Sequence, residues 1–354
     1  MFTSVRIQNF RQFRDLKLEG LGQINLITGA NDTGKTSLLE ALFLLDGPLD
    51  PRRTLVMADF RGIGGYSPDA PELWEWLFRD RDLRRAAELA WTGHDDLQRQ
   101  LKLSVAAGGL LPAIVNGTPQ ASDRPSLRVA SAESLPTLVY EYLGPSGEQE
   151  KTTLGWTSQG LILAPDRSLG MRQGFFLPDY HRPGVSEAER LSRLVETGRD
   201  AVLVEALQSV EPRLKRLTVL THGGRPGVHA DLDQYPLVPL MAMGSGVGKL
   251  LTTISAMILE EGPVFLIDEI GGGFHYSVLV DVWKVIVETA VKHSVQIFAT
   301  THSWECIEAA VKASEDHAGK LALFRLERHK DEIRAVDIED EDLRSAVGLG
   351  VELR

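Results

Sequence analysis

One stretch near the N-terminus combines glycines, a lysine and hydroxyl side chains at the spacing of a phosphate-binding loop. Residues 29–37 read Gly-Ala-Asn-Asp-Thr-Gly-Lys-Thr-Ser and match the pattern G-x-x-x-x-G-K-T. The glycines let the backbone turn so that its N–H groups can point at phosphate oxygens. Lys35 can supply positive charge to the β- and γ-phosphates, and the Thr36 hydroxyl can bind Mg²⁺. The predicted nucleotide-binding residues are Gly29, Asn31, Asp32, Thr33, Gly34, Lys35, Thr36 and Ser37.

Two acidic residues follow an apolar run late in the chain. Residues 264–267 are Val-Phe-Leu-Ile, and Asp268 and Glu269 come directly after them. A buried strand would present both carboxylates at its carboxyl end, which is the edge where open α/β sheets bind ligands. There Asp268 is the candidate Mg²⁺ ligand, and Glu269 is the candidate general base that activates water. Acids taken alone also suit a solvated strand end, but the phosphate loop favours the catalytic interpretation.

Two further motifs could lie at the same carboxyl edge of the predicted sheet. His302 follows an apolar run and two threonines, where it could donate a hydrogen bond to the γ-phosphate and to the hydrolytic water. Lys35, Glu269 and His302 are therefore the candidate catalytic residues. The neighbouring hydroxyl residues also suit a helix N-cap, and both interpretations can hold together. The glycine-rich turn at residues 243–248 enters a predicted helix, and such a turn at a helix N-terminus can form a second anion site.

The apolar patterns predict an α/β protein with a mixed sheet as its core and an additional antiparallel β lobe. We expect residues 1–47 and about 237–354 to form the nucleotide-binding core, and residues 48–236 to form an inserted lobe. Helices are predicted at residues 36–45, 71–90, 186–208, 244–260, 277–292 and 304–314. Strands are predicted at residues 2–8, 16–18, 23–28, 101–105, 113–115, 138–143, 152–156, 174–177, 214–221, 228–232, 264–267, 296–300, 321–326 and 333–337. Asn116-Gly117 is a candidate hairpin turn.

Composition narrows the class of protein. A chain of 354 residues is large enough for two lobes. Its net charge of −11 argues against a protein that is held on DNA by its overall charge. Its single cysteine, Cys306, excludes an internal disulfide. With no secretory signal at the N-terminus and no apolar run of membrane-spanning length, we expect a cytoplasmic protein without membrane contact.

Taken in order, these motifs resemble a known family. The phosphate loop with Asn31 at its third position, the glycine-serine turn, the Asp268-Glu269 pair and the Thr-Thr-His segment look like the ABC-type ATPases. The opening at residues 7–13, Ile-Gln-Asn-Phe-Arg-Gln-Phe, is similar to the SMC/RecF-like and OLD-like branch, often filed as AAA_15 or AAA_21. The chain lacks a long heptad segment. Only 52 residues follow His302, which is too few for a Toprim nuclease domain.

The resemblance implies a P-loop fold of the ABC-ATPase-head type that binds ATP and Mg²⁺ and hydrolyses ATP. It also implies a homodimer with two ATP molecules between the heads, in which Ser245 and Gly246 contact the γ-phosphate bound on the other protomer. Stand-alone heads of this kind often accompany a nuclease or toxin in bacterial anti-phage defence, so a separate effector protein is an expected partner.

Three other functions stay open. A DNA-repair or chromosome-associated ATPase would bind DNA directly, through arginines at residues 79–85 or the basic run at 213–216. A nucleotide-gated scaffold would bind ATP with little turnover. A GTPase is disfavoured because the sequence contains no N-K-x-D guanine motif.

Overall fold

The computed structural model describes residues 1–62, 72–106, 136–157, 160–164, 174–233, 236–338 and 340–349. The chain divides into two compact units. Unit 1 consists of Met1–Ser4, Lys17–Asp46 and Arg172–Arg354, and unit 2 consists of Val5–Leu16 and Gly47–Met171.

Unit 1 is built on a six-stranded sheet with the order β16-β15-β3-β14-β13-β9. Its strands are β3 (Ile24–Gly29), β9 (Phe175–Leu177), β13 (Val264–Ile267), β14 (Gln296–Thr300), β15 (Leu321–His329) and β16 (Glu332–Ile338). All neighbours pair in parallel except β15 and β16, which form an antiparallel hairpin. The strands β3, β13 and β14 are buried along their whole length, as expected for central parallel strands.

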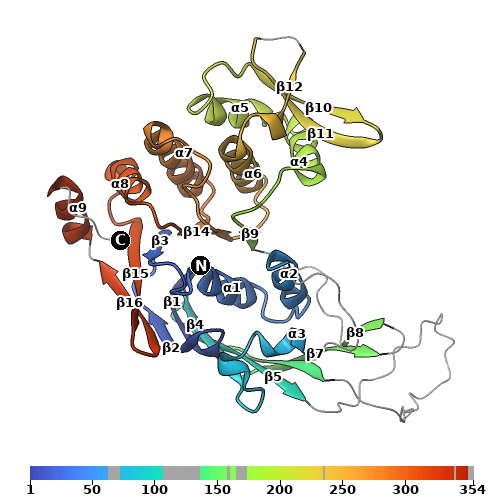
Figure 1. Cartoon of the computed structure of the whole chain (residues 1–354), viewed down its shortest axis with the longest axis vertical. Coiled ribbons are helices and arrows are strands. Elements are labelled where there is room, and N and C mark those ends of the chain that lie inside the picture. The colour runs from blue at the N-terminus through green and yellow to red at the C-terminus, as the bar shows by residue number, and fades with distance from the viewer. Residues whose placement is uncertain are drawn as a thin grey trace. The chain divides into compact units, whose positions relative to one another are not determined.

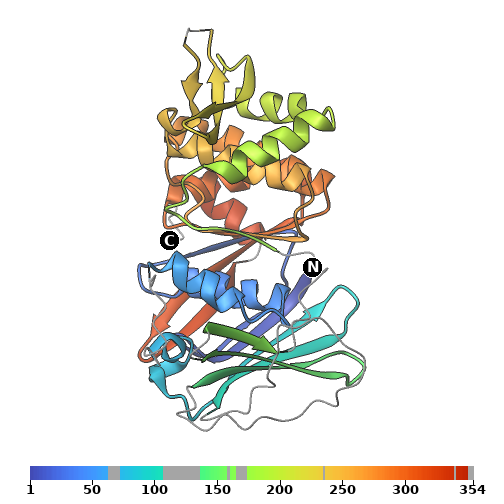
Figure 2. The same ribbon diagram turned by 90° about the vertical axis from the view of Figure 1, so that its right-hand side faces the viewer.

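Helices cover both faces of this sheet. Helix α1 (Lys35–Asp46) lies on one face, and α6 (Ser245–Ile258), α7 (Leu279–Lys292) and α8 (Trp304–Ala313) lie on the other (Figure 1; Figure 2). A short helix, α9 (Asp340–Leu349), follows the β15–β16 hairpin. Because the central strands are parallel, their carboxyl ends meet at one edge, where β3 leads into the phosphate loop.

On the side of α6, unit 1 also contains an extension made of helices and short strands. Its elements are α4 (Val185–Glu196), α5 (Asp200–Gln208), β10 (Arg216–His222), β11 (Arg225–Asp231) and β12 (Val238–Pro239). Leu191 on α4 and Leu203 on α5 are buried in the same apolar core as Ile254 on α6. This shared core places residues 174–233 with unit 1, whereas the sequence grouped them with the inserted lobe.

Unit 2 contains a seven-stranded sheet with the order β2-β1-β4-β5-β6-β7-β8. Its strands are β1 (Phe2–Phe10), β2 (Phe13–Leu18), β4 (Ala87–Gly93), β5 (Gln98–Ala106), β6 (Thr137–Leu143), β7 (Gln149–Thr157) and β8 (Gly160–Ala164). The pairings from β4 through β8 are all antiparallel. The predicted fold class, a mixed sheet core with an additional antiparallel β lobe, is confirmed.

The predicted helix at residues 71–90 is wrong. The structure has α3 (Glu72–Glu75), a single 3₁₀ turn at Arg79–Arg81 and then strand β4. Asp80 and Arg81 both adopt positive φ, which an α-helix cannot contain. Burial alternates along β4 with a period of two, so the apolar residues that suggested a helix belong in part to a strand.

Two smaller predictions fall on residues without a description. The turn at Asn116-Gly117 and the strand at residues 113–115 lie outside the described residues. A further helix, α2 (Arg53–Phe60), was not predicted. None of the described helices is both long and apolar enough to span a bilayer.

Candidate nucleotide-binding site

The phosphate loop links β3 to the N-terminus of α1. Gly29, Asp32 and Gly34 all have positive φ, so the backbone makes the tight reversals that the pattern requires. The Thr33 hydroxyl donates a hydrogen bond to the carbonyl of Ala30 at 2.8 Å and closes the loop from within. Helix α1 begins at Lys35, so its unpaired N–H groups point toward the loop and favour an anion there.

Lys35 is the buried cation of the site. Its Nζ donates to the carbonyl of Gly29 at 3.0 Å and to that of Ala30 at 3.3 Å. It also lies 4.0 Å from Oε1 of Glu269. The ammonium group is therefore held beside both the phosphate loop and the acidic pair.

Asp268 joins three elements of the sheet edge. Thr36 on α1 donates to its Oδ2 at 2.9 Å, and Thr300 at the end of β14 donates to its Oδ1 at 2.6 Å. The carboxylate is buried, so these two hydrogen bonds replace water as its partners. A hydroxyl and a carboxylate oxygen thus lie together at the position where the sequence predicted Mg²⁺.

Glu269 is held in an uncommon backbone conformation. Its φ is 46°, and its N–H donates to Oγ1 of Thr300 at 2.8 Å. Its carboxylate Oε2 lies 2.8 Å from Nδ1 of His302. Non-glycine residues adopt positive φ only where the surroundings impose it, and such residues cluster at functional sites. The candidate base and the candidate histidine are thus direct neighbours.

The glycine-rich turn lies against the segment that follows the acidic pair. Gly244 has a φ of 93°, and α6 starts at the exposed Ser245. Gly246 is packed so closely that a Cβ there would overlap the carbonyl oxygen of Gly273. Lys249 on the same helix is buried, and its Nζ donates to the carbonyls of Glu269 at 2.8 Å and Asp268 at 3.3 Å. Helix α6 is therefore tied directly to the turn that carries the two acids.

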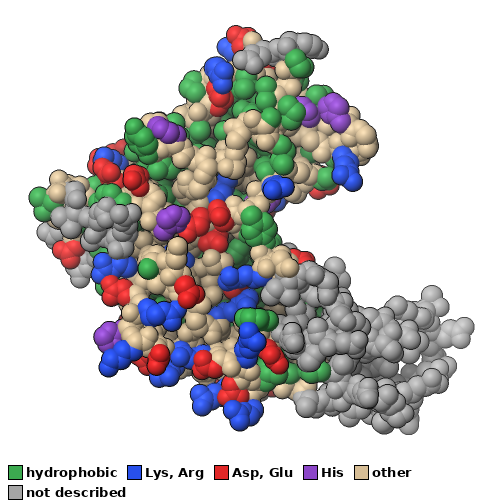
Figure 3. Space-filling view, viewed as in Figure 1, with side chains coloured by type: hydrophobic (Ala, Val, Ile, Leu, Met, Phe, Trp, Pro, Cys, Tyr) green, Lys and Arg blue, Asp and Glu red, His purple; other side chains and the backbone are tan. Residues whose placement is uncertain are grey.

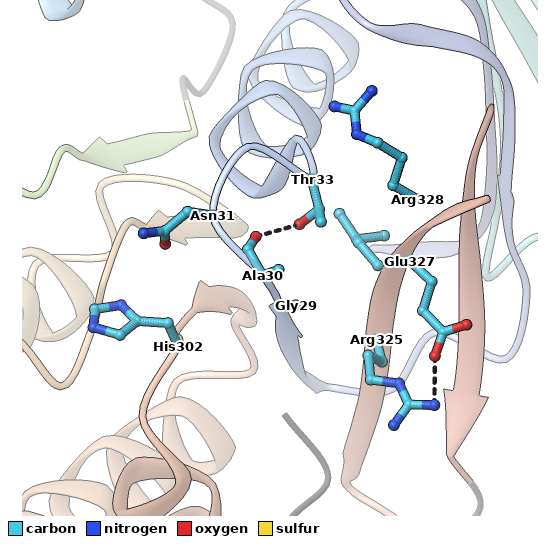
Figure 4. A pocket seen from close by; sticks show the side chains of 9 residues that line it. Gly29, Ala30, Asn31, Thr33, His302, Arg325, Glu327 and Arg328 are labelled. Carbon is cyan, nitrogen blue, oxygen red and sulfur yellow. Dashed lines mark hydrogen bonds and ion pairs between the residues drawn. The ribbon is translucent and has the colours of Figure 1, made fainter. Parts of the chain in front are cut away.

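A cavity of about 810 Å³ borders the phosphate loop on the side of β15. Its lining residues are Gly29, Ala30, Asn31, Thr33, His302, Arg325, Leu326, Glu327 and Arg328. In Figure 4, Asn31 and His302 project on one side of the loop strand, and the side chains of β15 project on the other. Ser245 and Gly246 are not among the lining residues, so within one chain the structure does not bring the glycine-rich turn to this cavity.

This chain is similar to known proteins in sequence and in fold. The family described as an AAA domain (AAA_23) matches residues 4–48. A protein named ATP/GTP phosphatase from Helicobacter pylori is 24% identical over 348 residues, which is 93% of both chains. The DNA replication and repair protein RecF of Idiomarina loihiensis is 48% identical over 42 residues, 12% of each chain.

Two solved SMC heads superimpose on the whole chain. An SMC head bound to the C-winged helix domain of ScpA has a TM-score of 0.53, 10% identity and coverage of 97% of this chain and 99% of its own. An SMC head with an extended coiled coil, bound to the C-terminal domain of ScpA derived from Pyrococcus furiosus, has a TM-score of 0.51, 9% identity and coverage of 99% of both chains.

The fold is that of an SMC-type ATPase head. The resemblance to SMC/RecF-like ABC-type ATPases that the motifs indicated is confirmed. In the sheet the phosphate loop follows β3, the histidine segment follows the neighbouring strand β14, and the acidic pair follows β13 beyond it.

The two basic runs of the head do not form an open cationic surface. Most of their arginines pair with acids close by in the sequence, and Arg81 stacks on Trp76 with its guanidinium carbon 3.8 Å from the ring centre. The ion pairs are Arg79–Asp80, Arg84–Asp82, Arg85–Asp82, Arg213–Glu211 and Arg216–Asp231. Across the face in Figure 3, blue Lys and Arg side chains alternate with red Asp and Glu. This pairing weakens the prediction of direct DNA contact.

Sequence reasoning missed the central position of Thr300 and the contact made by Lys249. Thr300 was interpreted only as a capping residue, yet its hydroxyl bridges Asp268 and the backbone of Glu269. A hydroxyl at the end of one apolar run and an acid at the end of another would have been the available signal. Lys249 stands directly after the glycine-rich turn, but spacing alone gives no indication that it is buried.

Proposed function

We propose that this protein is a Mg²⁺-dependent ATPase whose reaction takes place at the carboxyl edge of the unit 1 sheet. The observation that carries the proposal is the connected set Thr36–Asp268–Thr300–Glu269–His302, in which each residue is hydrogen-bonded to the next. These residues come from three separate parts of the chain. A purely structural strand end would not need a buried carboxylate, a left-handed glutamate and a histidine in one chain of contacts.

The residues divide the work of phosphoryl transfer to water. The phosphate-loop N–H groups and Lys35 bind the β- and γ-phosphates and stabilise the negative charge that develops on them. Glu269 accepts a proton from the attacking water, or orients it for attack in line with the leaving oxygen. His302 lies with Nδ1 2.8 Å from the Glu269 carboxylate; in the imidazolium form Nδ1–H donates to Glu269 and Nε2–H can donate to the γ-phosphate.

The residues present fit a magnesium ion. Mg²⁺ takes oxygen ligands and is commonly held by one or two protein groups, with phosphates and waters completing the octahedron. Thr36 and Asp268 supply such a pair, and the described residues contain no cluster of three or more His, Cys, Asp or Glu that would suit a different metal. When bound, the ion would neutralise the negative charge of the phosphates.

Hydrolysis of ATP and GTP by the purified protein tests this proposal. The relative from Helicobacter pylori is named for both nucleotides, whereas this sequence lacks the guanine motif N-K-x-D. We expect turnover with ATP to exceed turnover with GTP. The Lys35→Ala variant is the control and should lose turnover with both. Equal turnover in the Lys35→Ala variant would contradict a reaction at this site.

We further propose that two heads close around ATP. Ser245 is exposed, and it does not line the cavity beside the phosphate loop of its own chain. A contact between Ser245 and a γ-phosphate would therefore have to form with ATP bound to a second copy. The Glu269→Gln variant should keep ATP bound, and its solution mass should double only when Mg-ATP is added. A mass that never changes with ATP would contradict this mode of closure.

The proposed role of closure is to gate a separate effector protein, with anti-phage defence as the setting suggested by resemblance. Support comes from the solved SMC heads, which carry domains of the ScpA protein. Direct DNA binding is the second candidate. A salt-dependent DNA shift would favour that alternative, and no shift at low salt would exclude it. A scaffold without catalysis would bind ATP but show no turnover.

A further inference from the structure

Strand β15 lies directly beside the phosphate loop. In the parallel register of β3 and β15, Leu326 is opposite Gly29, the first residue of the loop. A Cβ at Gly29 would overlap the carbonyl oxygen of Leu326, so no side chain separates the two strands. The residues that follow Leu326 on β15 are therefore within reach of the outer side of the loop.

Arg328 makes this contact. Its guanidinium Nη2 donates to the backbone carbonyl of Asp32 at 2.6 Å. The same nitrogen lies 3.5 Å from the Asp32 carboxylate, whose side chain is 88% exposed. The shorter contact is to the carbonyl, and a charge-assisted hydrogen bond of this length is stronger than an exposed ion pair.

The hydrogen bond from Arg328 holds a loop residue whose backbone conformation is unfavourable. Asp32 has a φ of 61°, a conformation that costs free energy for a residue with a side chain. A donor that fixes the Asp32 carbonyl on the outside of the loop stabilises this conformation. The N–H groups of the loop are then directed inward before a nucleotide arrives, which lowers the ordering cost of binding.

We propose that Arg328 is a positioning residue for the nucleotide and acts through the Asp32 carbonyl rather than through the Asp32 carboxylate. This inference rests on the proposed binding of ATP. Arg328 needs no contact with the phosphates, and it should affect the affinity for ATP more than the rate of the chemical step. The motif pattern does not reveal it, because Arg328 stands 296 residues away from Asp32.

Titration of ATP against four proteins tests the proposal: the wild type, Arg328→Gln, Asp32→Asn and Arg334→Gln. Arg334 lies on the same hairpin and is ion-paired to Glu332 at 3.3 Å, so it is a matched control away from the loop. We expect Arg328→Gln to weaken ATP binding about tenfold, with kcat at saturating ATP within about twofold of the wild type. Asp32→Asn keeps the carbonyl and tolerates the left-handed conformation, so it should lose less affinity than Arg328→Gln, whereas Arg334→Gln should bind within about twofold of the wild type.

The outcomes are distinguishable. Wild-type affinity in Arg328→Gln overturns the inference and leaves the proposed function intact, whereas a wild type that does not bind ATP overturns both. A loss in Asp32→Asn as large as that in Arg328→Gln assigns the effect to the carboxylate and contradicts the carbonyl contact. Melting temperatures without ATP identify a general folding defect. If Arg328→Gln is unstable, Arg328→Met replaces it, and an affinity no weaker than wild type in this variant, which keeps the aliphatic stem but has no donor, would again overturn the inference.

Discussion

Charged and polar side chains are used differently in the two units. At the sheet edge of unit 1, Thr36 and Asp268 are 232 residues apart and hydrogen-bonded. On unit 2, Arg84 pairs with Asp82, and this hydrogen bond holds the pKa of the Asp82 carboxyl below its ordinary value. Opposite charges that are neighbours in sequence thus neutralise each other locally on the surface. At the candidate site, by contrast, the interacting side chains are far apart in sequence and are brought together by the fold. The predictions below test whether activity depends on these distant contacts and not on the local ion pairs.

The largest effect is expected from Asp268→Asn. Asparagine presents one carbonyl oxygen and an amide donor where Thr36 and Thr300 both donate, and it removes the anionic ligand for Mg²⁺. ATP turnover should fall at least about a hundredfold. Steady-state ATPase rates over a range of Mg²⁺ concentrations measure this. Turnover near the wild-type value would show that Asp268 is only a structural acceptor.

A smaller effect is expected from Thr300→Val, which preserves shape but removes the hydroxyl. The N–H of Glu269 and the buried Oδ1 of Asp268 would each lose a partner, at a cost of about 1–3 kcal/mol in the free energy of unfolding. Turnover should fall about tenfold because both acids lose orientation. Urea unfolding and ATPase assays report the two effects separately. The matched Thr301→Val variant should retain more turnover, because the Thr301 hydroxyl accepts a hydrogen bond from the Ser303 N–H, whereas the Thr300 hydroxyl joins the two acids.

Glu187 extends the comparison to a buried charge outside the candidate site. Burial raises the pKa of its carboxyl, but the hydrogen bonds from His181 and the Gly184 N–H and the charge of Arg190 outweigh burial and lower the pKa to about 2. Its carboxylate also accepts from Thr252 on α6, 65 residues away. Because the folded-state pKa lies below the ordinary value of 4.5, this stabilisation is present above that pH and is lost as the pH falls toward 2.

We therefore expect Glu187→Gln to lower the free energy of unfolding at neutral pH by up to about 3 kcal/mol. The difference from wild type should shrink as the pH falls from about 5 to about 3. Denaturant unfolding at several pH values checks this. A difference that stays constant with pH would mean that the loss comes from packing rather than from charge.

The smallest effect is expected from Arg84→Gln on unit 2. Arg84 is exposed and its partner Asp82 can be solvated by water, so neither melting temperature nor ATP turnover should change. Retention on DNA at low salt should also be unchanged. A clear loss of DNA binding in this variant would break the comparison, because it would give a locally paired arginine a function.

Much of the fold follows from sequence because the central strands are unambiguous. The apolar runs at β13 and β14 can only be buried, and each ends in the polar residues that carry the chemistry. Their relative placement does not follow in the same way. The bridging position of Thr300 requires β14 to lie between β3 and β13, and no spacing along the chain encodes that order.

Local backbone conformation explains the main error in the prediction of the elements. Residues 71–90 have apolar spacing that suits a helix, but Asp80 and Arg81 adopt positive φ and end any helix there. Neither residue is a glycine, so the usual signal for such a turn is missing. The contact of Arg328 with the phosphate loop is hidden for a related reason, since it uses a backbone carbonyl that residue identity does not reveal.

The central claim is that Glu269 activates water for attack on bound ATP. Its most direct test measures ATP affinity and single-turnover hydrolysis together in Glu269→Gln and wild type. We predict affinity within about threefold of wild type and a rate of hydrolysis lower by about a hundredfold to a thousandfold. A variant that hydrolyses ATP at the wild-type rate would contradict the claim.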